Sequence, residues 1–204
     1  MRTLAIATTN AGKVREIEEI LAGAGFDLVT LADWPDVAAP EETGRTFEEN
    51  ARQKALYYAA ATGALTVAED SGLEIDALGG MPGVESARFG GARTSYLEKF
   101  ALIYDGLRQR GAATSPARFV CALALARSNR IVFESRGTIE GLIAPQPRGE
   151  GGFGYDPIFF YPPLGQTLAE ASDRKRDVSH RGQAFGALRA FLERQHGEIF
   201  ERSR

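Results

Sequence analysis

The feature that most constrains the fold is the stretch from residue 65 to 72, which reads Leu-Thr-Val-Ala-Glu-Asp-Ser-Gly. A short apolar, β-branched run is typical of a strand, and here it is followed at once by Glu69, Asp70, Ser71 and Gly72. In α/β proteins the ends of strands are held rigidly and face the crevice where ligands bind. Because side chains alternate along a strand, we expect Glu69 and Asp70 to point to different sides. The alternative is a solvated turn, since Asp, Ser and Gly are common in turns.

Length and composition limit the class of protein. The chain has 204 residues, of which 44% are apolar and 25% charged, so we expect one two-lobed globular domain over residues 1–204. The formal net charge of −3, with no basic block longer than residues 174–176, argues against nucleic acid as a partner. Cys121 is the single cysteine, which excludes an intramolecular disulfide and a thiolate zinc cluster. The sequence shows neither a signal-peptide core nor an 18-residue apolar run, so we expect no membrane association and a cytoplasmic location.

A predicted strand over residues 3–7 leads into a polar loop that opens a helix. The loop consists of Thr8, Thr9, Asn10, Ala11, Gly12 and Lys13. The free N–H groups and the positive dipole end of a helix N-terminus favour phosphate, and Lys13 adds a full charge. The loop lacks the Walker A spacing. The alternative is an ordinary capped helix with an exposed lysine.

A capping box, Thr46 to Glu49, predicts a second helix that runs to about residue 62. Asn50 and Lys54 share a face of this helix with Phe47, so they are candidates to present an amide and an ammonium to a ligand. The alternative is a solvated stripe. Glu41 and Glu42 lie just before the cap, from where they can reach back toward Asp70.

The second half of the chain alternates regular elements with one unusual loop. Residues 96–110 predict a helix with Leu97, Phe100, Ala101, Tyr104 and Leu107 directed inward, and residues 118–139 predict a hairpin that turns at 128–129. Residues 149–160 then interleave glycines with Phe153, Tyr155 and Asp156. This pattern suits a wall against a planar ring, although a β-bulge or hairpin loop is the alternative.

The last predicted helix begins near Ser179 and runs to about residue 195. His180 and Arg181 fall in its first turn, where cations are mildly unfavourable to the helix dipole. An anionic or polar ligand explains their placement more easily than helix stability does.

Six of these stretches, in this order, resemble the HAM1-like family of noncanonical purine nucleoside triphosphate pyrophosphatases, the inosine/xanthosine triphosphatases. The matching stretches are residues 8–13, residues 41–44 with 46–51 and Lys54, residues 69–73, residues 80–84 with 86–89, residues 151–159 and residues 179–182. They span nearly the whole chain.

The resemblance implies an α/β fold with a mixed, elongated central sheet, flanking helices and two lobes around a cleft. It also implies a homodimer and Mg²⁺-dependent hydrolysis of ITP, dITP and XTP to the monophosphate and pyrophosphate, which cleanses the nucleotide pool. Asp70 matches the general base and a metal ligand, and the pair Glu41 and Glu42 supplies a second metal-site acid. The expected substrate-binding residues are Thr8, Thr9, Asn10, Ala11, Gly12, Lys13, Asn50, Lys54, Ser71, Phe153, Gly154, Tyr155, Asp156, Lys175, His180 and Arg181. Among these, Lys13 and Lys54 match the lysines that hold the triphosphate, and the set from Phe153 onward matches the residues around the purine.

The residue types fit this chemistry by themselves. Mg²⁺ takes one or two carboxylates together with phosphate oxygens, and lysines offset the charge of a triphosphate. Asp70 is predicted to orient water for attack at the α-phosphorus. Donors from His180, Arg181 or the backbone near Gly154 would favour 6-oxo purines. The competing hypotheses are a Maf-like pyrophosphatase of modified pyrimidine nucleotides, a non-catalytic nucleotide-binding module and a purely structural α/β domain.

Overall fold

The computed structural model describes residues 2–171 and 174–194 and contains one seven-stranded mixed sheet. The strand order is β2-β1-β3-β4-β5-β6-β7, in which β1 pairs in parallel with β2 and β3, and β6 pairs antiparallel with β5 and β7. The predicted α/β class with a mixed sheet and flanking helices is therefore confirmed. The chain divides into two compact units: Met1–Asp70, Ala122–Gly137 and Arg181–Arg204 form unit 1, and Ser71–Cys121 and Thr138–His180 form unit 2.

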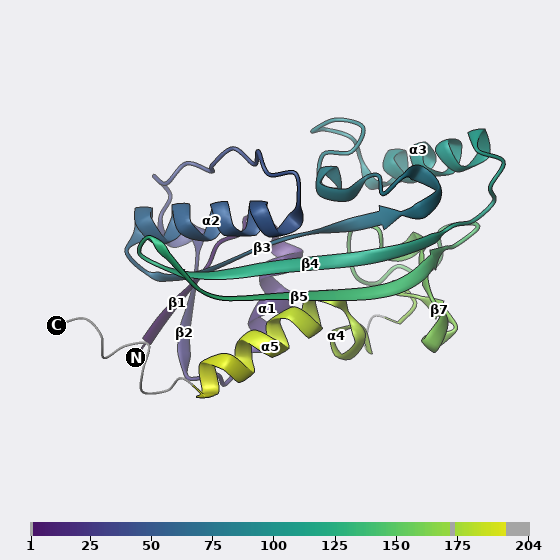
Figure 1. Ribbon diagram of the computed structural model, residues 1–204. Helices are drawn as coiled ribbons and strands as arrows, with labels where there is room; N and C mark the ends of the chain where they lie inside the picture. The colour runs from purple at the N-terminus through teal and green to yellow at the C-terminus, as the bar shows by residue number, and fades with distance from the viewer. Residues whose placement is uncertain (1, 172–173, 195–204) are drawn as a thin grey trace. The chain divides into compact units, whose positions relative to one another are not determined.

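Unit 1 contains the predicted alternation of strands and helices. Its elements are β1 (Arg2–Ile6), α1 (Ala11–Leu21), β2 (Phe26–Thr30), α2 (Phe47–Thr62), the first part of β3 (Leu65–Ile75), parts of β4 (Pro116–Arg127) and β5 (Arg130–Ile143), and nearly all of α5 (His180–Arg194). Figure 1 shows α2 on one face of these strands and α5 on the other. The Arg189 guanidinium joins α5 to α1 by donating to the Ile20 carbonyl oxygen at 3.2 Å. The two faces of β3 therefore meet different helices.

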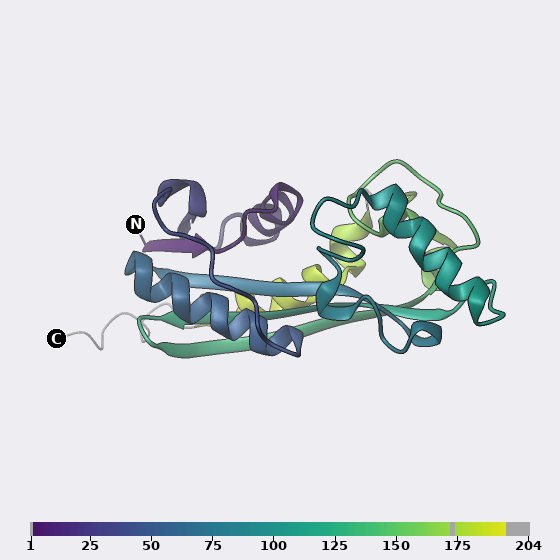
Figure 2. The same ribbon diagram turned by 90° about the horizontal axis from the view of Figure 1, so that it is seen from above.

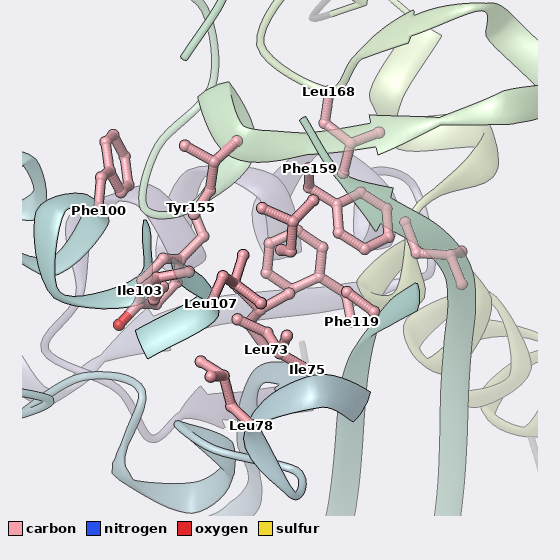
Figure 3. Close-up of a cluster of buried hydrophobic side chains, with 14 residues drawn as sticks. Leu73, Ile75, Leu78, Phe100, Ile103, Leu107, Phe119, Tyr155, Phe159 and Leu168 are labelled. Carbon is pink, nitrogen blue, oxygen red and sulfur yellow. The ribbon is translucent and has the colours of Figure 1, made fainter. Parts of the chain in front are cut away.

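Unit 2 is built around a core of aliphatic and aromatic side chains (Figure 3). Leu73 and Ile75 of β3 pack with Phe100, Ile103 and Leu107 of α3 (Tyr96–Gln109), all of them buried. The short elements β6 (Phe159–Tyr161), β7 (Gln166–Thr167) and α4 (Lys175–Val178) complete the unit. One prediction for α3 was wrong: Leu97 is 75% exposed and Ala101 is also exposed, because the buried stripe is centred on Phe100, Ile103 and Leu107.

Strand β3 differs from its prediction in one important respect. We expected a strand to end at the carboxylates, whereas β3 runs unbroken from Leu65 to Ile75 with Glu69 and Asp70 in its middle. Gly72 permits the continuation, since a Cβ there would collide with the Ser86 hydroxyl oxygen. That hydroxyl accepts a hydrogen bond from the Leu73 N–H at 2.9 Å. The two acids therefore lie on rigid extended backbone.

In the part of the chain that the structure describes, no helix has the length and apolar character that crossing a membrane requires. Figure 2 shows α1 and α2 of unit 1 as short helices, and α2, with 16 residues, is the longest helix among the described residues.

Candidate functional site

The polar loop after β1 opens α1 as predicted, and Asn10 is its N-cap. The Asn10 side-chain oxygen accepts from the backbone N–H of Gly12 at 3.0 Å and of Lys13 at 3.1 Å. The Thr8 hydroxyl accepts in turn from the Asn10 N–H at 3.2 Å. The protein itself therefore satisfies two backbone donors of the helix N-terminus.

Asp70 is held by the face of α2 on which Asn50 and Lys54 lie. The Asn50 amide donates to one Asp70 carboxylate oxygen at 2.9 Å, and the Lys54 ammonium lies 3.3 Å from the other. The Asn50 side-chain oxygen accepts from the Gly44 N–H at 2.8 Å, which fixes the orientation of the amide. The solvated-stripe alternative for this face is excluded, since Asn50 is fully buried and the Lys54 side chain is only 12% exposed.

The structure separates the two acids that precede α2. The Glu42 carboxylate lies 2.6 Å from the Lys54 ammonium, so it belongs to the same group of charges as Asp70. Glu41 is exposed. The local sequence pattern does not distinguish Glu41 from Glu42. The distinction comes from the three-dimensional position of Lys54, which only Glu42 is shown to contact.

The electrostatics around Asp70 combine burial with nearby cations. Burial raises the pKa of Asp70, and although Lys54 and the Asn50 hydrogen bond oppose this, the pKa stays above its ordinary value. Burial alone would lower the pKa of Lys54, but the carboxylates of Asp70 and Glu42 outweigh it, so this pKa is also raised. Lys54 is therefore firmly charged between two carboxylates.

Glu69 faces the other side of β3, as the alternation predicts. One oxygen of its buried carboxylate lies 3.0 Å from the Lys13 ammonium and 3.1 Å from the Arg181 guanidinium. Arg181 also contacts Glu16 of α1 at 2.6 Å. Burial alone would raise the pKa of Glu69, but the charges of Arg181 and Lys13 outweigh burial and hold it well below its usual range. Glu16 carried no role in the sequence reasoning, although its position three residues after Lys13 places it one helical turn away.

His180 and Arg181, adjacent in the sequence, belong to different units. The guanidinium of Arg181 is almost fully buried in its two ion pairs, whereas the sequence pattern predicted that an anionic or polar ligand accounts for its position in the first turn. The His180 ring stacks on Phe119 of unit 2, with ring centroids 4.8 Å apart and an interplanar angle of 9°.

The glycine-rich loop of unit 2 is organised around Asp156. One Asp156 carboxylate oxygen accepts from the Phe153 N–H at 2.8 Å and lies 2.7 Å from the Lys175 ammonium. The same ammonium lies 4.4 Å from the centre of the Phe153 ring. Gly152 has a φ of +70°, and a Cβ there would collide with the Asp156 carboxylate oxygen, so the turn requires glycine. The loop connects the antiparallel strands β5 and β6, as the hairpin-loop alternative predicts, and it ends in a 3₁₀ turn, Asp156–Ile158.

Tyr155 connects this loop to Ser86, for which the sequence reasoning predicted no role. Its hydroxyl donates to the Ser86 carbonyl oxygen at 2.8 Å, and its ring makes an edge contact with Tyr96 at 5.3 Å between centroids. The buried Lys99 ammonium donates to the neighbouring Ala87 carbonyl oxygen at 2.6 Å. No local pattern marks these contacts, because they join segments far apart in the chain.

The remaining predicted residues have simpler surroundings. Gly154 adopts a φ of +69° beside Tyr96, and Ser71 is half-buried directly after Asp70. Thr8, Thr9 and Ala11 line a cavity of about 620 Å³ within unit 1, together with apolar residues that include Trp34, Val37 and Tyr58. Lys13 is not among the residues that line it.

The carboxylates near Asp70 suit Mg²⁺, which binds partly through phosphate oxygens and water, better than they suit a metal ion that is held by protein side chains alone. Within residues 2–171 and 174–194, no group of three or more His, Cys, Asp and Glu side chains is arranged to hold a metal. Glu42 and Asp70 nevertheless converge on one cation, the Lys54 ammonium. Mg²⁺ is usually bound through one or two carboxylates plus phosphate oxygens and water, so these two hard ligands fit it.

The model of the Ham1 family matches residues 4–191. The chain belongs to the Ham1 family. The resemblance inferred from the sequence is thereby confirmed.

Relatives of this Ham1 chain are similar over nearly their whole length. A dITP/XTP pyrophosphatase of Exiguobacterium sp. is 51% identical over 92% of this chain and 95% of its own. One from Thermus thermophilus is 49% identical over 92% of this chain and 89% of its own. Among solved structures, a HAM1 protein from Coxiella burnetii superposes with a TM-score of 0.88 at 36% identity, covering 95% of this chain and all of that one. The Staphylococcus aureus Ham1 protein gives 0.84 with the same identity and coverage.

Proposed function

We propose that this Ham1 chain is a Mg²⁺-dependent dITP/XTP pyrophosphatase. It hydrolyses dITP, ITP and XTP to the monophosphate and pyrophosphate and so removes these nucleotides from the pool. The observation that carries the proposal is the group around Asp70: a buried carboxylate oriented by Asn50 and Lys54, with Glu42 on the same ammonium. The relatives at 51% and 49% identity support the choice of substrate.

Asp70 is the general base of the proposed reaction. Its carboxylate takes a proton from water as the water oxygen bonds to the α-phosphorus and the bond to the bridging oxygen of the pyrophosphate breaks. A base works best when its pKa is near the working pH, and burial raises the pKa of Asp70 in that direction. Asn50 and Lys54 occupy one oxygen each of the carboxylate and so fix its plane.

Glu42 and Asp70 are the residues that would hold Mg²⁺. The ion supplies neutralisation of the charge on the phosphate oxygens and on the leaving pyrophosphate. Lys13 and Lys54 bind phosphate oxygens, and both ammonium groups are already ordered by carboxylates within 3.3 Å. This ordering lowers the entropic cost of binding a polyphosphate.

We assign recognition of the base to the loop of Phe153 to Asp156 with Lys175. The Phe153 ring offers a flat surface, and the positive-φ glycines let the backbone approach a ligand closely. Backbone N–H donors near Gly154 suit the 6-oxo group of hypoxanthine and xanthine, which adenine lacks. His180 is the second candidate donor. Arg181 contributes less directly, since Glu69 and Glu16 already bind its guanidinium.

The deciding experiment compares kcat/KM for dITP, XTP, GTP and ATP while monitoring pyrophosphate release. We expect dITP and XTP to be preferred over ATP by about 100-fold or more, because unpaired donors in the base site penalise an amine. Binding of dITP without pyrophosphate release would instead identify a binding module. Higher activity on modified dTTP or UTP would favour a Maf-like enzyme.

We also infer that two copies of the chain form a homodimer, as the family resemblance implies, each copy being one two-lobed domain over residues 1–204. Light scattering on the purified protein tests this assembly, and a monomeric mass at working concentration would contradict it.

A further inference from the structure

Glu69 is a buried charged group of unit 1 for which the proposed mechanism has no use. It lies next to Asp70 in β3, but its side chain faces α1 and α5 instead of α2. Its carboxylate is 1% exposed, so the surrounding protein shields it from solvent. A buried carboxylate at such a position needs cationic partners, and Lys13 and Arg181 supply them.

Both partners are residues expected to bind substrate. Lys13 and Arg181 contact the same Glu69 oxygen, Oε1, at 3.0 and 3.1 Å. The Lys13 side chain is 17% exposed, and that of Arg181 only 2%. Lys13 is thus the member of this group whose ammonium is both held from inside and open to solvent.

Arg181 connects the group to a second point on α1. Its guanidinium spans Glu69 and Glu16, so the first turn of α5 is attached both to β3 and to α1. Lys13 consequently lies at the end of a chain of ion pairs whose other members are fixed by three separate elements.

We propose that Glu69 is a positioning residue, whose carboxylate holds the Lys13 ammonium in the orientation that binds a polyphosphate. The inference rests on the proposed function only in assigning Lys13 to the triphosphate. A lysine has a flexible four-carbon stem, and immobilising it on binding costs entropy. Glu69 removes part of that cost in advance, as preorganised sites do.

A purely electrostatic role for Glu69 and a positioning role predict opposite effects of its removal on polyphosphate binding. If this carboxylate acted only as a counter-charge, Glu69→Gln would free a positive charge and strengthen the binding of a polyanion. Positioning predicts weaker binding, because the ammonium loses its fixed orientation. The sign of the change therefore distinguishes the two roles.

The test is a double-mutant cycle with inorganic tripolyphosphate and Mg²⁺, measured by calorimetry on the full chain. We expect Glu69→Gln and Lys13→Met each to weaken binding by about tenfold, and the double variant to bind no more weakly than Lys13→Met alone. Unchanged or tighter binding by Glu69→Gln would overturn the proposal. If the fold-losses of affinity in the two single variants multiplied in the double variant, the proposal would also be overturned, since Glu69 would then not act through Lys13.

Two further variants guard the result. Glu69→Asp keeps the charge but retracts it by one methylene, so this variant tests the proposal if Glu69→Gln does not fold. Positioning predicts that Glu69→Asp weakens tripolyphosphate binding in the wild-type background and has no effect in the Lys13→Met background. Wild-type affinity of Glu69→Asp would contradict the proposal. Glu134→Gln removes an exposed carboxylate that pairs with Arg52 at 2.5 Å and should leave binding unchanged. Because the probe is not a nucleotide, the cycle succeeds or fails independently of whether wild-type protein hydrolyses dITP.

Discussion

The two groups of predicted site residues differ in residue type and in the secondary structure that carries them. In unit 1 the group consists of charged side chains on regular elements: Lys13, Lys54, Asp70 and Arg181 lie on helices and a strand, and each is held by an ion pair. In unit 2 the group is a glycine-rich loop of aromatic rings with one buried ion pair, Asp156 with Lys175.

The difference matches what each half of a nucleotide requires. A polyphosphate is flexible and highly charged, so its binding site needs ammonium groups at fixed positions. A purine is flat and neutral, so its binding site needs a ring surface and a few well-placed donors. The comparison therefore predicts that substitutions in unit 1 change chemistry and polyphosphate binding, whereas those in unit 2 change only recognition of the base.

The largest expected effect is that of Asp70→Asn. This substitution keeps the shape of the side chain but removes the proton acceptor, so kcat should fall by about 10²–10⁴-fold while tripolyphosphate still binds. Pyrophosphate release under saturating dITP measures kcat, and calorimetry measures binding. Asp76→Asn, which changes a carboxylate paired with Arg118 in unit 2, is the matched control and should retain wild-type kcat. Appreciable turnover by Asp70→Asn would remove Asp70 from the role of base.

The next effect separates the two acids before α2. We expect Glu42→Gln to raise the Mg²⁺ concentration for half-maximal activity by about 10–100-fold, because it loses one of two hard ligands. Glu41→Gln changes an exposed neighbour and should leave the Mg²⁺ dependence as it is in the wild type. EDTA should abolish the activity of all three proteins. Equal shifts in the two variants would show that the contact of Glu42 with Lys54 does not mark the metal ligand.

A smaller effect is expected in unit 2. Phe153→Ala removes the ring next to the Lys175 ammonium and should raise KM for dITP by about tenfold, the value of one lost stacking contact, with kcat unchanged. Phe160→Ala, on the half-exposed strand β6 of the same unit, is the control. If Phe153→Ala also weakened tripolyphosphate binding, the division of labour between the two groups would be wrong.

Much of the fold follows from local pattern, and the exceptions are instructive. The strand β1, the helices α1, α2 and α5, and the Asn50–Lys54 face of α2 were all visible in hydrophobic period and capping residues. The continuation of β3 through Glu69 and Asp70 was not. A pair of acids reads as a strand end until Lys13, Arg181, Lys54 and Asn50, all distant in sequence, supply their partners.

The sequence predicted a set of candidate residues but not the contacts between them. The choice of Glu42 over Glu41, the burial of Arg181 between two carboxylates, and the Ser86 carbonyl that anchors Tyr155 all depend on long-range geometry. Leu97 of α3 shows that local pattern can also mislead. It is apolar and has helical spacing, yet it is 75% exposed, because the buried face of the helix is centred on other positions.

The smallest expected effect is a pH dependence of stability that distinguishes the two neighbouring acids. Burial raises the pKa of Asp70 above its unfolded value of about 3.9, so ionising Asp70 costs stability. That cost is absent below about pH 4, grows as the pH rises, and is complete above the folded pKa. Glu69 has the opposite effect on stability: its folded pKa is lowered, so its stabilising contribution is present above about pH 4.3 and is lost as the pH falls.

Urea unfolding in EDTA measures this contrast. We expect Asp70→Asn to be slightly more stable than wild type at pH 7 and equal to it at about pH 4, whereas Glu69→Gln should be less stable than wild type at pH 7. A loss of stability at pH 7 in Asp70→Asn would mean that its contacts with Lys54 and Asn50 outweigh the cost of its burial, and the contrast between the two sides of β3 would fail.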